Sequence, residues 1–347
     1  MSRAAAVRAE RAEFEAGEAV PASGATPPYA HATVLRDEVV AALAEVPSGW
    51  VVDCTLGGGG HSEALLRARP DVRLLGLDRD ADALLAAQAR LVGFGERFLC
   101  AHAPFADVDR VLDRLGIREV AGFIADLGVS SPQLDRADRG FSFRSDGPLD
   151  MRMDPSRGEP LRERLLRVRQ EDLAVVLREY GDVDRPGRAA RVCCEAAAEG
   201  VDSTVELAAR ISRVLPGPSK IHPATRVFQA LRIWVNDEIE QLERLLAVAP
   251  PRLLPGGVMA VISFHSGEDR VVKHTFRALA PRHGEFELPV RKSIEADVVE
   301  VSVNPRARSA RLRLLRRPLA DAFDAVADAG DDGDEGPAFD LDEEGGR

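Results

Sequence analysis

The sequence has no uninterrupted apolar run of about 18 residues, the length that a helix needs to cross a membrane. No membrane span and no membrane partner are therefore expected. The first 28 residues lack the apolar stretch of a secretory signal and predict a disordered N-terminal arm, 1–28. Cysteine is also scarce, and neither a CxxC pair nor zinc-ligand spacing occurs among Cys54, Cys100, Cys193 and Cys194. This usage predicts a reduced, cytoplasmic protein with no metal site.

Lysine is rare too, with three among the 46 basic residues. The arginines that replace it suit phosphate and stack on bases, but GC-rich coding gives the same bias. The net charge of −11 resides in the ends: residues 320–347 carry 11 acids and one Arg, and residues 1–30 carry four acids and three Arg. The body between them is neutral, so bulk charge neither indicates nor excludes a nucleic-acid partner. The acidic, Gly-rich segment 319–347 predicts a disordered tail.

Four short apolar runs alternate with helical patterns in the first part of the chain. The runs cover 49–56, 71–80, 97–105 and 120–128, and acids stand near the ends of three of them. Helical periodicity follows from about residue 62, over 81–95 and over 105–116. This alternation predicts a parallel, doubly wound sheet.

The alternation stops at about residue 138. Helical patterns then cover 161–169, 170–181, 186–200 and 204–216 with no strand pattern between them, which predicts an inserted helical subdomain over 138–219. The α/β pattern resumes with a long helix over 224–249, a strand over 258–264 and a helix over 267–279. A terminal strand pair is expected over 297–303 and 310–317. The main domain therefore has two parts, 29–137 and 220–318.

Four consecutive glycines, Gly57 to Gly60, follow the first apolar run in "VVDCTLGGGGHSEALL". Bare backbone at the first β–α turn admits a dinucleotide, a phosphate or a methyl donor. The glycines alone partly satisfy almost any template, including the G-x-G-x-x-G of a pyrophosphate site. Asp53, just before them, would repel a pyrophosphate but can pair with the cationic amino-acid end of S-adenosylmethionine. The spacing therefore favours a methyl-donor loop.

Three nearby residues have a ligand-binding and a structural interpretation each. Asp78 ends the second strand, where its carboxylate can accept both ribose hydroxyls of an adenosine or simply occupy a turn. The ring of Phe105 can pack on adenine or belong to the core. His61 can donate to a cofactor carboxylate or only begin a helix.

A polar loop of about 30 residues, "DLGVSSPQLDRADRGFSFRSDGPLDMRMDP", follows the fourth strand. A loop of this length at that edge is usually functional or disordered, and its Phe and Met residues argue against disorder. Phe141 and Phe143 can stack a displaced base, with Arg139 and Arg144 on its phosphate. The alternative is that both rings anchor the loop to the core.

The loop, together with "HATVLRDEVV", "DCTLGGGGHS", "HPATRVFQALRIWVNDEIEQLE", "ISFHSGEDRVVK" and "NPRARSARLR", closely resembles the ribosomal RNA small subunit methyltransferase H family, from about His31 to Arg317. The resemblance implies S-adenosylmethionine-dependent methylation of the N4 amino group of a decoding-site (P-site) cytidine in 16S rRNA. Seven strands with an antiparallel edge also fit the Rossmann-like class I S-adenosylmethionine methyltransferase fold. The implied partner is 16S rRNA or the small ribosomal subunit, and a homodimer is a candidate assembly.

Position by position, the resemblance implies a set of cofactor contacts: Gly59, Gly60, His61, Asp78, Phe105, Asp126 and Gln133. "LGGGGH" has a glycine where relatives often carry a larger residue. The arginines expected on RNA phosphates are Arg139, Arg144, Arg152, Arg226 and Arg232. The helical insert and the 130–155 loop are expected to grip the RNA around an exposed cytosine.

The catalytic group is left open. Amino-directed methyltransferases often carry an acid-Pro-Pro-aromatic loop after the fourth strand, whereas this chain has "DLGV", 126–129. Candidate hydrogen-bond acceptors for the amine are Asp126, Ser130, Ser131, the backbone carbonyls of the loop and His265, with Asn236 a weaker one. Without the resemblance, an NAD-dependent oxidoreductase would be the alternative, and a non-catalytic nucleotide-binding module that assists ribosome assembly would be a third.

Overall fold

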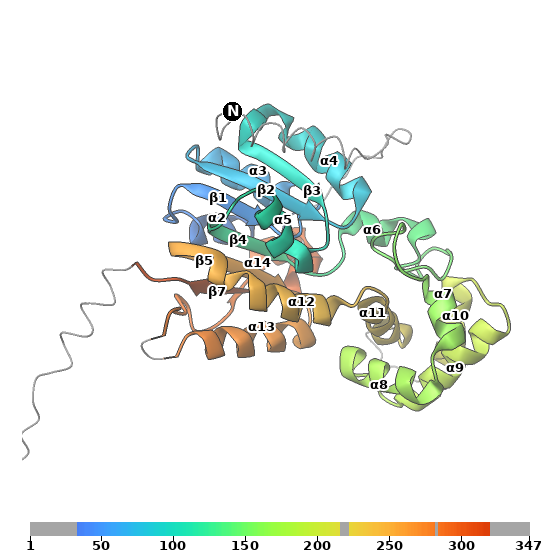
Figure 1. The fold of residues 1–347 in the computed structure, drawn as a ribbon. Helices are drawn as coiled ribbons and strands as arrows, with labels where there is room; N and C mark the ends of the chain where they lie inside the picture. The colour runs from blue at the N-terminus through green and yellow to red at the C-terminus, as the bar shows by residue number, and fades with distance from the viewer. Residues whose placement is uncertain (1–32, 216–221, 282–283, 320–347) are drawn as a thin grey trace, which may run out of the picture.

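The computed structural model describes residues 33–215, 222–281 and 284–319, and the expected disorder of 1–28 and most of 319–347 concerns residues outside these ranges. The described chain forms a seven-stranded sheet in the order β3-β2-β1-β4-β5-β7-β6 (Figure 1). The strands are β1 Gly49–Asp53, β2 Val72–Asp78, β3 Phe98–His102, β4 Val120–Asp126, β5 Leu253–Ser263, β6 Ile294–Glu295 and β7 Arg311–Arg316. Strands β1 to β5 pair in parallel, and β7 runs antiparallel to both β5 and β6. The predicted class I methyltransferase fold is confirmed.

Helices cover both faces of the sheet because the parallel strands are apolar on both sides. On one face α5 (Val108–Arg114), α12 (Glu238–Val248) and α13 (Ser266–Leu279) pack on a buried cluster that includes Phe123 and Met259. On the other face α2 (Arg36–Ala42), α3 (Gly60–Ala68) and α4 (Ala81–Leu91) enclose a second cluster. The strand order reverses between β1 and β4, which makes the crevice at their carboxyl ends the expected ligand site.

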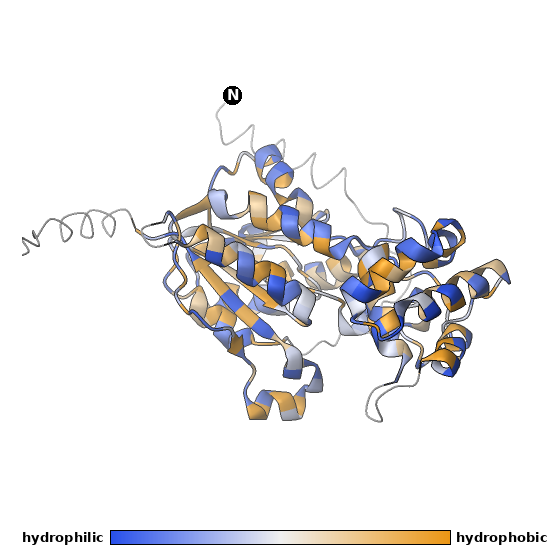
Figure 2. Cartoon of the chain, turned by 90° about the horizontal axis from the view of Figure 1, so that it is seen from below, coloured by the Kyte–Doolittle hydropathy of each residue, from blue (hydrophilic) through white to orange (hydrophobic). Residues whose placement is uncertain are grey.

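The insert has a hydrophobic core of its own. Its helices are α7 (Leu161–Arg167), α8 (Gln170–Gly181), α9 (Pro186–Ala198) and α10 (Thr204–Val214), and the short α6 (Ser131–Asp135) leads into it. The same core takes in α11 (Ala224–Val235), which packs on α8. Figure 2 shows the insert as a second lobe beside the sheet. The core of the insert therefore extends to Val235, beyond the boundary expected at residue 219.

Two secondary-structure elements differ from those that the sequence predicts. The single helix expected over 224–249 is two helices, because the backbone of Asp237 turns left-handed, with φ +49°, between α11 and α12. The strand expected over 297–303 is a short helix, α14 (Val298–Val303). Its first turn is capped by Asp297, which accepts from the Glu300 amide at 2.7 Å, and Glu300 in turn accepts from the Leu35 amide at 2.8 Å. The local capping bond and the long-range bond to Leu35 together outweigh the strand preference of its valines.

Candidate functional site

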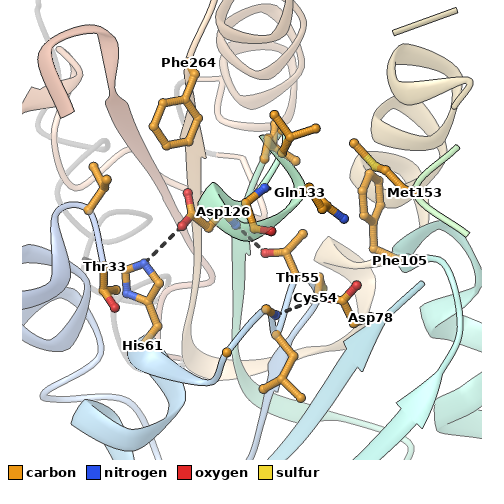
Figure 3. Close-up of a pocket in the computed structure, with 18 of the residues that line it drawn as sticks. Thr33, Cys54, Thr55, His61, Asp78, Phe105, Asp126, Gln133, Met153 and Phe264 are labelled. Carbon is orange, nitrogen blue, oxygen red and sulfur yellow. Dashed lines mark hydrogen bonds and ion pairs between the residues drawn. The ribbon is translucent and has the colours of Figure 1, made fainter. Parts of the chain in front are cut away.

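A cavity of about 320 Å³ lies beyond the carboxyl ends of β1, β2 and β4, within the size range of small-molecule sites (Figure 3). It is lined by residues from the glycine loop, the loop after β4, the segment after β5 and the segment before β7. The predicted residues that it brings together are Gly60, His61, Asp78, Phe105, Asp126, Ser130, Gln133 and Arg232. One cavity thus unites positions that are spread over more than 170 residues of sequence.

The glycine loop keeps its backbone open toward the cavity. Gly57, with φ +51°, donates its amide to Asp78 Oδ2 at 2.7 Å. Gly60 has no room for a side chain, because a Cβ there would lie 1.9 Å from Thr33 Oγ1. Gly59, with φ +77°, is packed toward Leu91 instead and does not line the cavity. Its left-handed backbone turns the chain into α3, and its direct contact with the cofactor stays a prediction.

Asp53 does not reach the cavity, contrary to the expectation that it meets the amino-acid end of the cofactor. It is 1% exposed and accepts from Ser62 Oγ at 2.6 Å and from the Thr55 amide at 3.2 Å. Burial raises the pKa of this carboxyl, although the bond from Ser62 works against the shift. Asp53 therefore holds the loop and the first turn of α3 together from behind.

Asp78 stands at the carboxyl end of β2 and lines the cavity with acceptor capacity to spare. Its two oxygens accept from the amides of Gly57 and Asp80 at 2.7 and 2.8 Å. Burial, and the charges of Asp80 and Asp53, raise its pKa to about 6 despite those two hydrogen bonds. A carboxylate oxygen accepts more than one hydrogen bond, so ribose hydroxyls can still bind here. Phe105 and Met153 lie beside it and supply an apolar wall (Figure 3).

Gln133 is fixed by its surroundings. Its Oε1 accepts from the Ser130 amide at 3.0 Å, which forms a capping box on α6, and its Nε2 donates to Asp80 Oδ2 at 2.8 Å. One amide hydrogen remains for a ligand in the cavity. Ser130 lines the cavity as well, whereas Ser131 does not and instead accepts from Arg306 Nη1.

His61 and Asp126 face each other across the cavity floor (Figure 3). Their Nε2 and Oδ2 atoms are 3.6 Å apart. Both ring nitrogens of His61 and Oδ1 of Asp126 are buried with no hydrogen bond among the described residues. Unpaired buried polar atoms are costly, so such a cluster indicates that a polar ligand completes the site. The ammonium and carboxylate of an amino acid fit this donor and acceptor set.

Contrary to expectation, Arg139 and Arg152 are not available to RNA phosphates, because their guanidinium groups already bind other residues of the protein. Arg139 is 7% exposed, pairs with Asp80 at 3.0 Å, and donates to the carbonyls of Arg152 and Met153. Arg152 donates through Nε and Nη2 to Asp150 and through Nη1 to two loop carbonyls. Both residues shape the loop after β4. Arg144 and Arg226 are exposed, although Arg226 also donates to the Asp182 carbonyl.

The two phenylalanines of the loop anchor it, which was the alternative to base stacking. Phe141 is 6% exposed within the core of the insert. Phe143 packs edge-on against Phe228, with 4.8 Å between ring centroids, and against His222 at 4.7 Å. Neither ring lines the cavity. The expectation that these rings stack on a displaced base is therefore not supported.

Two of the acceptor candidates are likewise structural. His265 faces a separate pocket between α8, α11 and the start of α13, and its Nδ1 caps α13 by accepting from the Glu268 amide at 3.3 Å. Asn236 is 1% exposed and clamps the insert loop, accepting from the Met153 amide and donating to the Met151 carbonyl, each at 2.8 Å. Of the predicted acceptors only Asp126 and Ser130 line the cavity.

Arg232 lines the cavity rather than an outer RNA-binding surface. It makes a two-pronged ion pair with Glu238, Nε to Oε1 at 2.8 Å and Nη2 to Oε2 at 2.9 Å. Burial alone would lower the pKa of this guanidinium, but the charges of Glu238 and Glu268 raise it. The paired arginine lines the cavity, which argues against its predicted contact with an RNA phosphate.

Several cavity residues escaped prediction: Thr33, Phe264, Glu238, Glu268 and Arg306. All five lie within, or within a few residues of, the sequence motifs that carried the family resemblance. No periodicity marked them individually. Among the described residues no group of three His, Cys, Asp or Glu side chains is placed to hold a metal ion. No described helix is long and apolar enough to cross a membrane.

A family model and the similar curated proteins point to the same family of methyltransferases. The model of a family described as the MraW methylase family matches residues 28–318. Ribosomal RNA small subunit methyltransferase H of Sorangium cellulosum is 48% identical over 291 residues, which cover 83% of this chain and 90% of that protein. The protein of the same name from Syntrophotalea carbinolica is 46% identical, with coverage of 83% and 98%. A Streptococcus mutans methyltransferase solved in complex with S-adenosylhomocysteine aligns with a TM-score of 0.37, 11% identity and coverage of 82% and 98%.

Proposed function

This chain belongs to the MraW methylase family and is an S-adenosylmethionine-dependent methyltransferase of small-subunit ribosomal RNA, and we propose that it methylates the N4 amino group of a decoding-site (P-site) cytidine in 16S rRNA. The observation that carries the proposal is Asp126, a carboxylate at the end of β4 with acceptor capacity that the described residues leave unused. An exocyclic amine presents hydrogens that need such an acceptor.

In this proposal, one group of cavity residues would bind the adenosine of the cofactor and another group would bind its amino-acid end. Asp78, Phe105 and Gln133 would hold the adenosine, and the glycine loop and His61 would hold the amino-acid end. A cofactor contact of Asp126 would use Oδ2, which lies beside His61, and would leave Oδ1 for the substrate amine. When bound, S-adenosylmethionine supplies a methyl group on a sulfonium, whose departing sulfur is a good neutral leaving group. No metal is required for that chemistry, so placement of the amine contributes most of the rate.

Asp126 has the main chemical role in the proposal. The N4 lone pair of cytosine is delocalised into the ring, so the amine has to pyramidalise before it reacts. A carboxylate that accepts one amine hydrogen favours that geometry and receives the proton that methylation releases. Thr55 Oγ1 accepts from the Asp126 amide at 2.6 Å and helps to fix the end of the strand.

Methylation at cytosine C5 is the second candidate, and the cysteines argue against it. That reaction needs a cysteine thiolate to add to C6 of the base. Cys54 is the one cysteine among the cavity residues, but it is 1% exposed, and burial raises the pKa of its thiol well above the ordinary value. Reactive cysteines have lowered pKa values. The N4 amine is therefore better supported than C5 as the methyl acceptor.

A cytosine inside folded RNA has to leave its stack to enter the cavity. We propose that the insert and the loop after β4 form the surface that holds the RNA around it. Arg144 and Arg226, which are exposed, are the remaining phosphate candidates. Loss of each true phosphate contact should reduce the salt dependence of RNA binding by about one unit of slope.

The test supplies S-adenosylmethionine with a labelled methyl group to unmethylated small subunits and, separately, to bare 16S RNA. Incorporation is then mapped along the RNA by nuclease protection. The proposal expects label at a single decoding-site cytidine in at least one of the two substrates. Label elsewhere in the RNA, or in neither substrate, would contradict it.

A further inference from the structure

Gly128 marks a part of the cavity that the cofactor residues do not account for. It follows β4 with φ +92°, and a Cβ built there would lie 3.9 Å from Phe264 Cδ2 and 4.0 Å from Nη1 and Nη2 of Arg232. The backbone at Gly128 is thus bare, with an aromatic ring and a guanidinium beside it. Phe264 lies on the opposite side of Asp126 from Phe105 (Figure 3).

The sheet register explains why these residues meet. Strands β4 and β5 are parallel neighbours, and Asp126 pairs with Ile262. Continuing the register by two residues brings Gly128 beside Phe264. The loop after β4 has no aromatic at the position where many amino-directed methyltransferases carry one. Phe264, the residue directly after the adjacent strand β5, presents a ring at the same edge of the sheet.

Arg232 is held rigidly in this place. Its Nε and Nη2 are taken by Glu238, which leaves Nη1 as the guanidinium nitrogen outside that ion pair. On the far side Glu268 accepts from the Phe264 amide at 2.9 Å, and its Oε1 lies 3.1 Å from His265 Nε2. Ring and guanidinium are therefore positioned by one buried set of charges, with Glu238 8% and Glu268 2% exposed.

We propose that Phe264 and Arg232 form the seat of the displaced base: the ring of Phe264 stacks on a pyrimidine, and Arg232 Nη1 donates to acceptors on its Watson–Crick edge. The inference rests on the proposed function and names the residues that would recognise its substrate. Base–aromatic stacking and arginine donation are common ways in which proteins hold an unstacked base.

The chemistry of this seat suits cytosine. Cytosine presents two acceptors, N3 and O2, next to its N4 amine, whereas N3 of uracil carries a hydrogen. Arginine is always a donor, so it pairs with the first edge and opposes the second. With N3 and O2 held by Arg232, the neighbouring amine is directed toward Asp126. The same contacts thus select the base and orient the amine.

Two substitutions test the seat. Phe264→Leu keeps an apolar side chain but removes the aromatic ring, whereas Phe264→Tyr, a separate variant, keeps the ring. We expect Phe264→Leu to lower kcat/KM for the RNA substrate about 5- to 150-fold, the range for one lost base–aromatic stack. Phe264→Tyr should stay within about threefold of the wild type, because its ring can stack in the same way. Arg232→Lys keeps a charge against Glu238 but loses the planar donor, and should lower kcat about tenfold or more.

Phe105→Leu is the matched comparison, because it removes a ring from the opposite wall. It should weaken binding of S-adenosylhomocysteine, whereas Phe264→Leu and Arg232→Lys should leave that affinity near the wild-type value. Rates are compared well below the thermal midpoint of each variant, because lysine loses one of the two bonds to Glu238. Wild-type rates with both Phe264→Leu and Arg232→Lys would overturn the inference. So would a loss in Phe264→Leu that appears only as weaker S-adenosylhomocysteine binding. A wild-type enzyme that transfers no methyl group to cytidine would instead refute the proposed function.

Discussion

Replacement of Arg139 by methionine should destabilise the protein and weaken cofactor binding together. Arg139 Nη1 donates to Asp80 Oδ2 at 3.0 Å, and its Nη2 donates to the carbonyls of Arg152 and Met153 at 3.2 and 2.7 Å. The same Asp80 oxygen accepts from Gln133 Nε2 at 2.8 Å. One buried carboxylate therefore joins the loop after β4 to a residue of the cofactor cavity.

The burial of Arg139 and Asp80 sets the size of the expected loss in the free energy of unfolding. Arg139 is 7% and Asp80 3% exposed, and removal of one partner from a buried ion pair costs about 3–5 kcal/mol. Gln133 and the Asp82 amide still donate to Asp80 after the substitution, so we expect about 3 kcal/mol. Without Arg139 the carboxylate is free to shift, and Gln133 loses its fixed orientation. Loss of one such hydrogen bond should weaken S-adenosylhomocysteine binding about tenfold.

The assay is urea unfolding of Arg139→Met, Asp80→Asn and the double variant, combined with calorimetric titration of S-adenosylhomocysteine. Asparagine retains the acceptor that caps α4, so Asp80→Asn removes the charge and keeps the cap. The double variant should be less destabilised than the sum of the single ones, because neither charge is left alone. Arg164→Met, which removes bonds to Trp234 and Asp237 elsewhere in the insert, is the control for cofactor affinity. A cost below about 1 kcal/mol for Arg139→Met, or strictly additive effects, would refute the coupling.

Two further predictions concern the cofactor cavity. Since the folded pKa of Asp78 is about 6, above its ordinary value of 3.8, the protonated carboxyl stabilises the ligand-free fold, and that contribution is lost as pH rises through about 6. Ribose hydroxyls bind best to the ionised carboxylate, so the affinity for S-adenosylhomocysteine should fall below about pH 6 in titrations from pH 8 to 5. The Asp78→Asn variant should bind weakly at every pH. If that variant kept the wild-type pH profile, Asp78 would be excluded as the titrating group. Gly60→Ala should weaken the same affinity by displacing Thr33, whereas Gly93→Ala, where a Cβ meets nothing within 4 Å, should not; equal affinities in the two variants would count against the close packing at Gly60.

Residues whose location depends only on the order of the strands could be placed correctly from the sequence. Parallel strands end at one edge, so Asp78 and Asp126 were expected at a common crevice, and both line it. Strand order does not determine which way an acid at that edge points. Asp53 ends β1, which lies between the strands of Asp78 and Asp126. Its carboxylate nevertheless points beneath the glycine loop and accepts a hydrogen bond from Ser62. Only the path of α3 decides this, and no local pattern encodes it.

Long-range pairing explains the remaining differences. Arg139 stands in a polar loop, where an arginine is usually solvated, but its partner Asp80 lies 59 residues earlier in the chain. Phe264 and Arg232 come from motifs with ordinary strand and helix patterns, and they meet only through the sheet register and the break after α11. The valines of α14 have strand propensity, and a capping bond and a contact with Leu35 override it. Such pairings depend on the assembled fold.

The atom that receives the methyl group tests the central claim most directly. Small subunits are incubated with the enzyme and S-adenosylmethionine that carries a deuterated methyl group, and the RNA is digested to nucleosides for chromatography with mass spectrometry. We expect the deuterated product to co-elute with N4-methylcytidine. A labelled product that co-elutes with 5-methylcytidine or with a ribose-methylated nucleoside would contradict it.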